Sequence, residues 1–114
     1  MSVALPKGIR IGPFAYKVVS KRAELNQRRV DYAERDLVGQ CDHRELTIAV
    51  DSALAPAVQR ETLLHEVMHA IYALVGAEGQ KLTEEETILR IVPSLLDTLQ
   101  RNPELAAFML EVEG

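Results

Sequence analysis

Several features are scarce in this 114-residue chain. It contains one cysteine, Cys41, no tryptophan and only three tyrosines and two phenylalanines. A single thiol excludes a disulfide within the chain, agrees with a reducing compartment, and is expected to be half-buried and inert. No stretch reaches the roughly 18 uninterrupted apolar residues of a membrane span, and the first residues lack the apolar core of a signal peptide. We therefore expect a cytoplasmic protein with no membrane partner.

An excess of positive charge is also missing. The chain carries 17 acidic and 13 basic residues, for a formal net charge of −4. There is no global positive field to attract nucleic acid, and the few aromatic residues further disfavour a nucleic-acid-binding module. The basic side chains gather only locally, at Lys21, Arg22, Arg28 and Arg29. With 47% apolar and 26% charged residues, the composition predicts one globular domain over residues 1–114.

The most informative stretch is residues 61–71, which contains His-Glu-x-x-His within an apolar helical pattern. The helix is expected to run from about residue 56 to residue 75. His65 and His69, four residues apart, would lie one turn apart on one face and could hold one metal ion. Zinc lowers the pKa of a bound water to about 7, and Glu66 could take the proton of that water. The alternative is two hydrogen-bonded core histidines beside a surface glutamate.

Alternating apolar and polar residues predict short strands in the first half of the chain. Residues 9–11 and 16–19 flank Gly12-Pro13, which indicates either two short strands or one strand with a turn. Residues 37–41 and 46–50 flank a short polar segment and are expected to form an antiparallel pair. The charged segment from residue 20 to residue 36 fits a short helix or a surface loop, and the pattern does not distinguish them.

A second helix is expected after residue 82. Thr83 and Glu86 have the spacing of a capping box, which gives Glu86 a local role at the start of the helix. Glu85 lies at the centre of an apolar stripe formed by Ile88, Leu89, Val92, Leu95, Leu96 and Leu99. A carboxylate on a buried face must bind a cation, take up a proton or lie in an exposed first turn. A shorter final helix is expected after Asn102, a candidate N-cap.

Residues from about 37 to 105 resemble the gluzincin metallopeptidases. They are most similar to the small stand-alone minigluzincins and to the phage- and prophage-encoded proteins of ImmA/IrrE type. A strand leads into a helix with Thr-Leu-Leu-His-Glu-Val-Met-His-Ala-Ile, and a second helix opens with Glu-Glu-Glu. The resemblance implies zinc bound by His65, His69 and Glu85, with Glu66 as catalytic base. The repressor-cleaving members usually carry Asn or Asp four residues after the third ligand, where this chain has Leu89.

These observations predict an α+β fold in which a small, mainly antiparallel sheet packs on the His-Glu-x-x-His helix and a following glutamate helix. The expected function is zinc-dependent hydrolysis of a peptide or protein, with the strand at residues 46–50 pairing with an extended substrate. His43 and Tyr72 are candidates for stabilising an oxyanion by their chemistry alone. The alternative is a non-catalytic interaction protein that keeps zinc as a structural staple.

Overall fold

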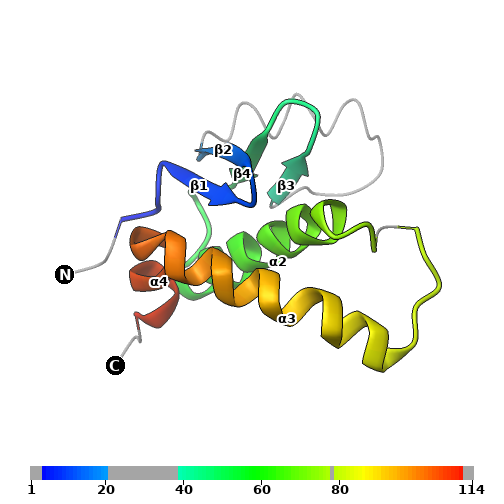
Figure 1. Ribbon diagram of the computed structural model, residues 1–114. Coiled ribbons are helices and arrows are strands. Elements are labelled where there is room, and N and C mark those ends of the chain that lie inside the picture. Colours follow the sequence, from blue (N-terminus) through cyan, green and yellow to red (C-terminus); the bar gives the residue numbers. More distant parts are fainter. Residues whose placement is uncertain (1–3, 21–38, 78, 112–114) are drawn as a thin grey trace.

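The computed structural model describes residues 4–20, 39–77 and 79–111. The sheet forms one layer and the helices lie beneath it (Figure 1), so the predicted α+β class is confirmed. The basic cluster and residues 21–36 of the undecided segment lie outside the described residues. The described elements are β1 (Gly8–Ile11), β2 (Phe14–Val19), β3 (Gly39–Asp42), β4 (Thr47–Val50), α2 (Pro56–Leu74), α3 (Glu84–Arg101) and α4 (Pro103–Leu110).

The four strands form one sheet in the order β1-β2-β4-β3. β1 and β2 make an antiparallel hairpin whose turn contains Gly12 at φ 58°, a conformation that glycine adopts without steric cost. β3 and β4 form the second antiparallel pair. The first pattern is therefore two strands, and the predicted antiparallel pairing of residues 37–41 with 46–50 is confirmed for residues 39–41, since residues 37 and 38 lie outside the described residues. The contact between β2 and β4, in which Val18 pairs with Ile48, is parallel, so the sheet is mixed.

The position of β4 corrects one prediction. Residues 46–50 were expected to pair with an extended substrate, but β4 is hydrogen-bonded to β2 on one side and to β3 on the other. Its backbone groups are already paired, so it offers no edge to a peptide. Among the described strands, β3 and β1 end the sheet. The strand pattern in the sequence identifies strands but does not give their order in a sheet.

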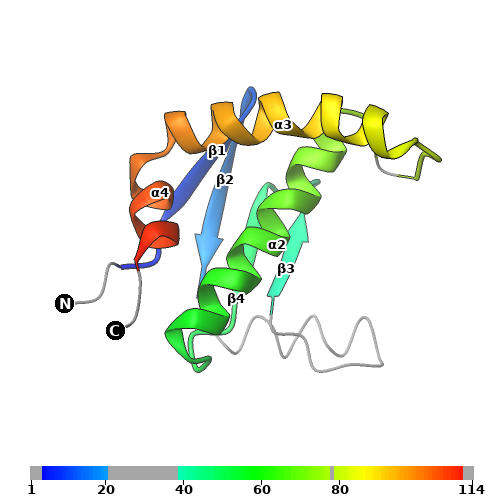
Figure 2. The same cartoon turned by 90° about the horizontal axis from the view of Figure 1, so that it is seen from below.

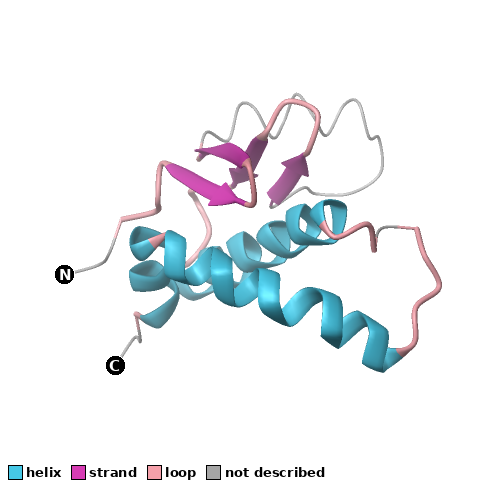
Figure 3. Cartoon of the chain, in the orientation of Figure 1, coloured by secondary structure: helices cyan, strands magenta, loops and turns pink. Residues whose placement is uncertain are grey.

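Helix α2 lies directly beneath the sheet (Figure 3). Pro56 occupies its first turn, where the missing N–H is harmless, and Gly76 follows its end at φ 70°. The predicted span of residues 56–75 is thus confirmed to within one residue. Its sheet-facing side chains fill the centre of the core together with those of β1, β2 and β4: Leu63, Val67, Ala70 and Ile71 are completely buried.

None of the described helices is both long enough and apolar enough to cross a bilayer.

Helix α3 begins directly after Thr83, as the predicted capping box requires. The Thr83 hydroxyl accepts a hydrogen bond of 3.1 Å from the Glu86 backbone N–H. α3 then crosses beneath α2 and reaches β1 and α4 (Figure 2). Its buried residues are Ile91 and Thr98.

The prediction that the apolar stripe of α3 is a buried face is wrong for most of its residues. Leu89 is 65% exposed, whereas Leu95 and Leu99 are partly buried and pack against the core. α3 crosses α2 instead of lying along it, so the two helices touch over a short segment. Helical periodicity shows which residues share a face, but not which element covers that face. The stripe residues that are about half exposed or more are Ile88, Leu89, Val92 and Leu96.

Asn102 connects the end of α3 to the sheet. Its Oδ1 accepts a hydrogen bond of 2.8 Å from the Arg10 N–H, and its Nδ2 donates to the carbonyl oxygens of Arg10 and Thr98 at 2.7 Å. The expected side-chain cap of α4 is absent, because this side chain is used by β1 and α3. These bonds join the segment between α3 and α4 to β1.

Candidate metal centre

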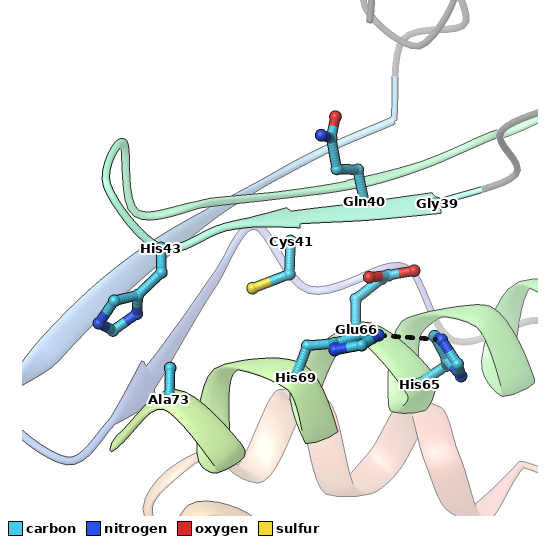
Figure 4. Close-up of a pocket in the computed structure, with 8 residues that line it drawn as sticks. All are labelled: Gly39, Gln40, Cys41, His43, His65, Glu66, His69 and Ala73. Carbon is cyan, nitrogen blue, oxygen red and sulfur yellow. Dashed lines mark hydrogen bonds between the residues drawn. The ribbon is translucent and has the colours of Figure 1, made fainter. Parts of the chain in front are cut away.

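His65 and His69 project from the middle of α2, one turn apart. Their Nε2 atoms lie 3.2 Å apart, and both side chains are exposed (Figure 4). Two nitrogen ligands at about 2.0–2.1 Å from a tetrahedral zinc are separated by roughly 3.3 Å. The 3.2 Å contact is a hydrogen bond between the two rings, and its length is also compatible with two nitrogen ligands of one zinc ion. The alternative of two hydrogen-bonded core histidines is correct in part: the rings are hydrogen-bonded to each other, but neither is buried, and the glutamate between them is buried instead of exposed.

Glu66 is the buried member of the motif, with 7% of its surface exposed. Its carboxylate points from α2 toward Gly39 of β3 (Figure 4). Burial raises the pKa of this carboxyl above its ordinary value of 4.5, while the nearby His65 and His69 rings oppose the shift. A partly desolvated carboxylate beside two exposed imidazoles is suited to exchanging protons with a water or substrate near them.

Gly39 makes room for that carboxylate. A Cβ at this position would lie 2.5 Å from Thr62 Cγ2 and 3.0 Å from Glu66 Oε2. Its φ is not positive, so space and not backbone conformation requires a glycine here. Sequence reasoning did not single out Gly39, although a glycine within a strand pattern is a known indication of close backbone approach.

An open cavity of about 380 Å³ lies beside this contact and is lined by residues of both β3 and α2. Cys41 points into it from β3 and is half-buried, as expected, and Gly39 lies above Glu66 (Figure 4). The cavity thus has a strand on one side and the whole His-Glu-x-x-His motif on the other. Its lining residues are Gly39, Gln40, Cys41, His43, His65, Glu66, His69 and Ala73.

His43 reaches the cavity from the turn between β3 and β4. The Phe14 ring meets it edge-on with ring centroids 5.3 Å apart, and the Tyr16 hydroxyl is hydrogen-bonded to its Nδ1. The imidazole is therefore held by two aromatic residues of β2, although His43 itself is largely exposed. A fixed imidazole at the end of the cavity keeps His43 a candidate for contact with substrate. Tyr72, the other candidate, lines a separate cavity.

Glu85 is not assembled with the histidine pair. It is exposed in the first turn of α3, on the same uncovered stripe as Leu89. Within residues 4–20, 39–77 and 79–111, no three His, Cys, Asp or Glu side chains form a group that could hold a metal ion. The structure therefore supplies two side chains that fit zinc and leaves the predicted third ligand apart from them.

Comparisons with protein-family models, with curated proteins and with solved structures found no match.

Proposed function

We propose that this protein is a zinc-dependent peptidase in which His65 and His69 hold the metal and Glu66 is the general base. One observation carries the proposal. The two Nε2 atoms are separated by 3.2 Å, and a buried carboxylate follows directly on the same helix, beside an open cavity. Peptidases of the His-Glu-x-x-His type combine two imidazoles one helical turn apart with an adjacent carboxylate base.

Zinc, when bound, would polarise the scissile carbonyl and acidify a water molecule. The chain's own contribution is proton transfer and positioning. Glu66 would accept a proton from the water and then donate it to the leaving amine, and burial, which raises the pKa of its carboxyl, strengthens it as a base.

An extended peptide is the proposed substrate, and β3 is the strand proposed to pair with it. β3 ends the described sheet on the side of the cavity, whereas β4 is bonded on both edges. Backbone pairing with an edge strand binds peptides largely independently of their sequence. A substrate bound there would run along the cavity, above Glu66 and the two histidines.

Glu85 remains the proposed third ligand. The proposal rests on the family resemblance and on the position of Glu85 in the acidic first turn of α3. Its carboxylate is exposed, and the first turn of α3 must approach α2 for it to reach the metal. Zinc binding through Glu85 would therefore change the relation between the two helices.

A structural zinc staple is the competing function. Structural zinc sites are closed by four protein ligands. Both histidines are exposed, so an ion held between them would stay open to solvent. This exposure favours a catalytic site over a staple.

The first test is zinc binding measured by calorimetry and elemental analysis. We expect about one zinc per chain. His65→Ala and His69→Ala should each abolish stoichiometric binding, whereas Glu66→Gln and the surface control Glu61→Ala should keep it. If Glu66→Gln loses zinc as completely as His65→Ala, Glu66 is a ligand and the proposed mechanism is wrong.

The second test is cleavage of a complex peptide library by the zinc-loaded protein, with products identified by mass spectrometry. Wild type should generate new peptide termini, and Glu66→Gln should generate none above the protein-free background. Equal cleavage by the two proteins would contradict the role of Glu66. Zinc binding without any cleavage would favour the structural staple.

A further inference from the structure

The outer edge of β1 carries a contact that the proposed peptidase site does not use. Among the described strands, only β2 pairs with β1. In an antiparallel pair, successive residues turn their backbone N–H and C=O groups alternately toward the partner strand and away from it. The Lys7 carbonyl faces β2, because it accepts a hydrogen bond from the Val18 N–H. Gly8 and Arg10 therefore direct their backbone groups to the outer edge of the sheet.

Asn102 occupies both outward groups of Arg10. Its Oδ1 accepts a hydrogen bond from the Arg10 N–H, and its Nδ2 donates one to the Arg10 carbonyl oxygen. A residue of a neighbouring strand would make the same two bonds. Asn102 lies 92 positions along the chain from Arg10, and it is 9% exposed. Its buried amide thus takes the place of an adjacent strand at this point of the edge.

The rest of this edge is short. Gly8 is exposed, and Pro6, the next residue that would face outward, has no N–H to donate. Unpaired backbone groups on an edge strand are a template for pairing with another chain, and proteins block such edges with proline or with a covering segment. Without the Asn102 amide, β1 would offer two successive outward residues, Gly8 and Arg10, to a further strand.

These two residues are complementary to themselves. A twofold axis at Ile9 would place Gly8 of one copy opposite Arg10 of a second copy, and each pair would exchange two backbone hydrogen bonds in an antiparallel ladder. Each arginine would then lie opposite a glycine, so no like charges would face each other. A second copy of this chain is therefore the partner that the outer edge of β1 fits.

We propose that Asn102 blocks the outer edge of β1 against pairing with a second copy of this chain. The same side chain also donates to the Thr98 carbonyl oxygen, so the block is attached to the end of α3. Release of this end from β1 would open the edge. The inference depends neither on zinc nor on the proposed peptidase activity.

The first test is amide hydrogen exchange measured by NMR. The Arg10 and Gly8 amides face the same edge, and in wild type we expect Arg10 to exchange at least about tenfold more slowly, relative to its intrinsic rate. In dilute Asn102→Ala, Arg10 should lose this protection, whereas the Ile9 and Ile11 amides, which face β2, should keep theirs. Equal protection of Arg10 and Gly8 in wild type overturns the block, and that comparison needs no variant.

The second test is sedimentation velocity at increasing protein concentration. Asn102→Ala and Asn102→Ser should each self-associate at least about tenfold more tightly than wild type. Adding Gly8→Pro to either variant should reverse this gain, because proline has no N–H to pair at the edge. Gly8→Pro in the wild-type background should change nothing.

Arg101→Ala is the matched control, because the neighbouring Arg101 side chain bonds to Asp97 and not to β1. It should sediment as wild type does. Two substitutions of Asn102 are used so that a failure of one to fold does not decide the outcome. Folded Asn102 variants that associate no more than wild type, or an association that Gly8→Pro leaves unchanged, would overturn the proposal and reduce Asn102 to an anchor of α3.

Discussion

Glu66 and Gly39 form one steric unit in the candidate site. The glycine allows β3 to lie close above α2, and the carboxylate occupies the space that a side chain at position 39 would take. The close approach buries Glu66, and burial is the main cause of its raised pKa. The absence of a side chain at Gly39 thus contributes to the burial of Glu66, and this burial raises the pKa of the proposed base.

Gly39→Ala should destabilise the protein by about 1–3 kcal/mol, the usual range for adding a methyl group to a packed interior. The new Cβ would lie 2.5 Å from Thr62 Cγ2 and would displace either that side chain or the strand. Chemical denaturation would measure the effect. Gly8→Ala is the control, because its Cβ would meet only ordinary contact distances, and it should change stability by less than about 0.5 kcal/mol. Equal losses of stability in the two variants would show that β3 is not in close contact with α2 at Gly39.

Glu66→Gln should stabilise the metal-free protein at neutral pH. The pKa of Glu66 is raised in the folded state, so the unfolded chain ionises first as pH rises above 4.5, and folding then requires uptake of a proton. Stability is lost as pH rises from 4.5 through the folded-state pKa. Glutamine carries no such penalty.

Thermal melts in the presence of a chelator would test this prediction between pH 4 and pH 8. The difference in Tm between Glu66→Gln and wild type should be small at the acid end and grow with pH. A difference that is constant with pH would mean that ionisation of Glu66 does not affect folding.

At the level of elements, the most apolar face of α3 is not the face that packs against the core. Ile91 is 6% exposed and Leu89 is 65% exposed, although they lie two residues apart. The Asn102 bonds to Arg10 hold the end of α3 against β1, and this anchor fixes the face that α3 presents to the core. The uncovered stripe is a consequence of where the helix is attached.

Truncating one side chain on each face of α3 should show which face contributes to stability. Ile91→Ala removes buried methyl groups and should cost about 2–4 kcal/mol of unfolding free energy. Leu89→Ala removes a largely solvated side chain and should change stability by less than about 0.5 kcal/mol. Denaturant titration of the two variants would measure both values. A larger loss for Leu89→Ala would mean that the stripe is covered in solution.

For the whole molecule, if Glu85 is the third ligand as proposed, zinc binding would change how α2 and α3 lie relative to each other. Glu85→Ala should weaken zinc binding by at least about tenfold, roughly 1.4 kcal/mol, because a charged oxygen ligand is lost. Glu84→Ala and Glu86→Ala are the controls and should leave zinc affinity unchanged.

Competition titration against a chelator would measure all three affinities. Wild-type affinity in Glu85→Ala would exclude this residue as a ligand and leave α3 outside the site. A larger loss at Glu84 or Glu86 would move the ligand to another position in the same turn.

The sequence alone determined the local features of this protein. The extent of α2, the cap at Thr83 and the two antiparallel strand pairs were predictable, because each depends on residues a few positions apart. The proximity of His65 and His69 was predictable for the same reason, since a helix places residues four apart on one face.

Only the tertiary structure decided the relations between elements. It placed β4 inside the sheet, left the stripe of α3 uncovered, and brought Gly39 of β3 onto Glu66 of α2. A periodic pattern specifies a face of a helix or strand, whereas the neighbour of that face depends on how all elements share one small core. That is why the motif could be identified from the sequence, and why the burial of its glutamate and the separation of Glu85 from its histidines could not.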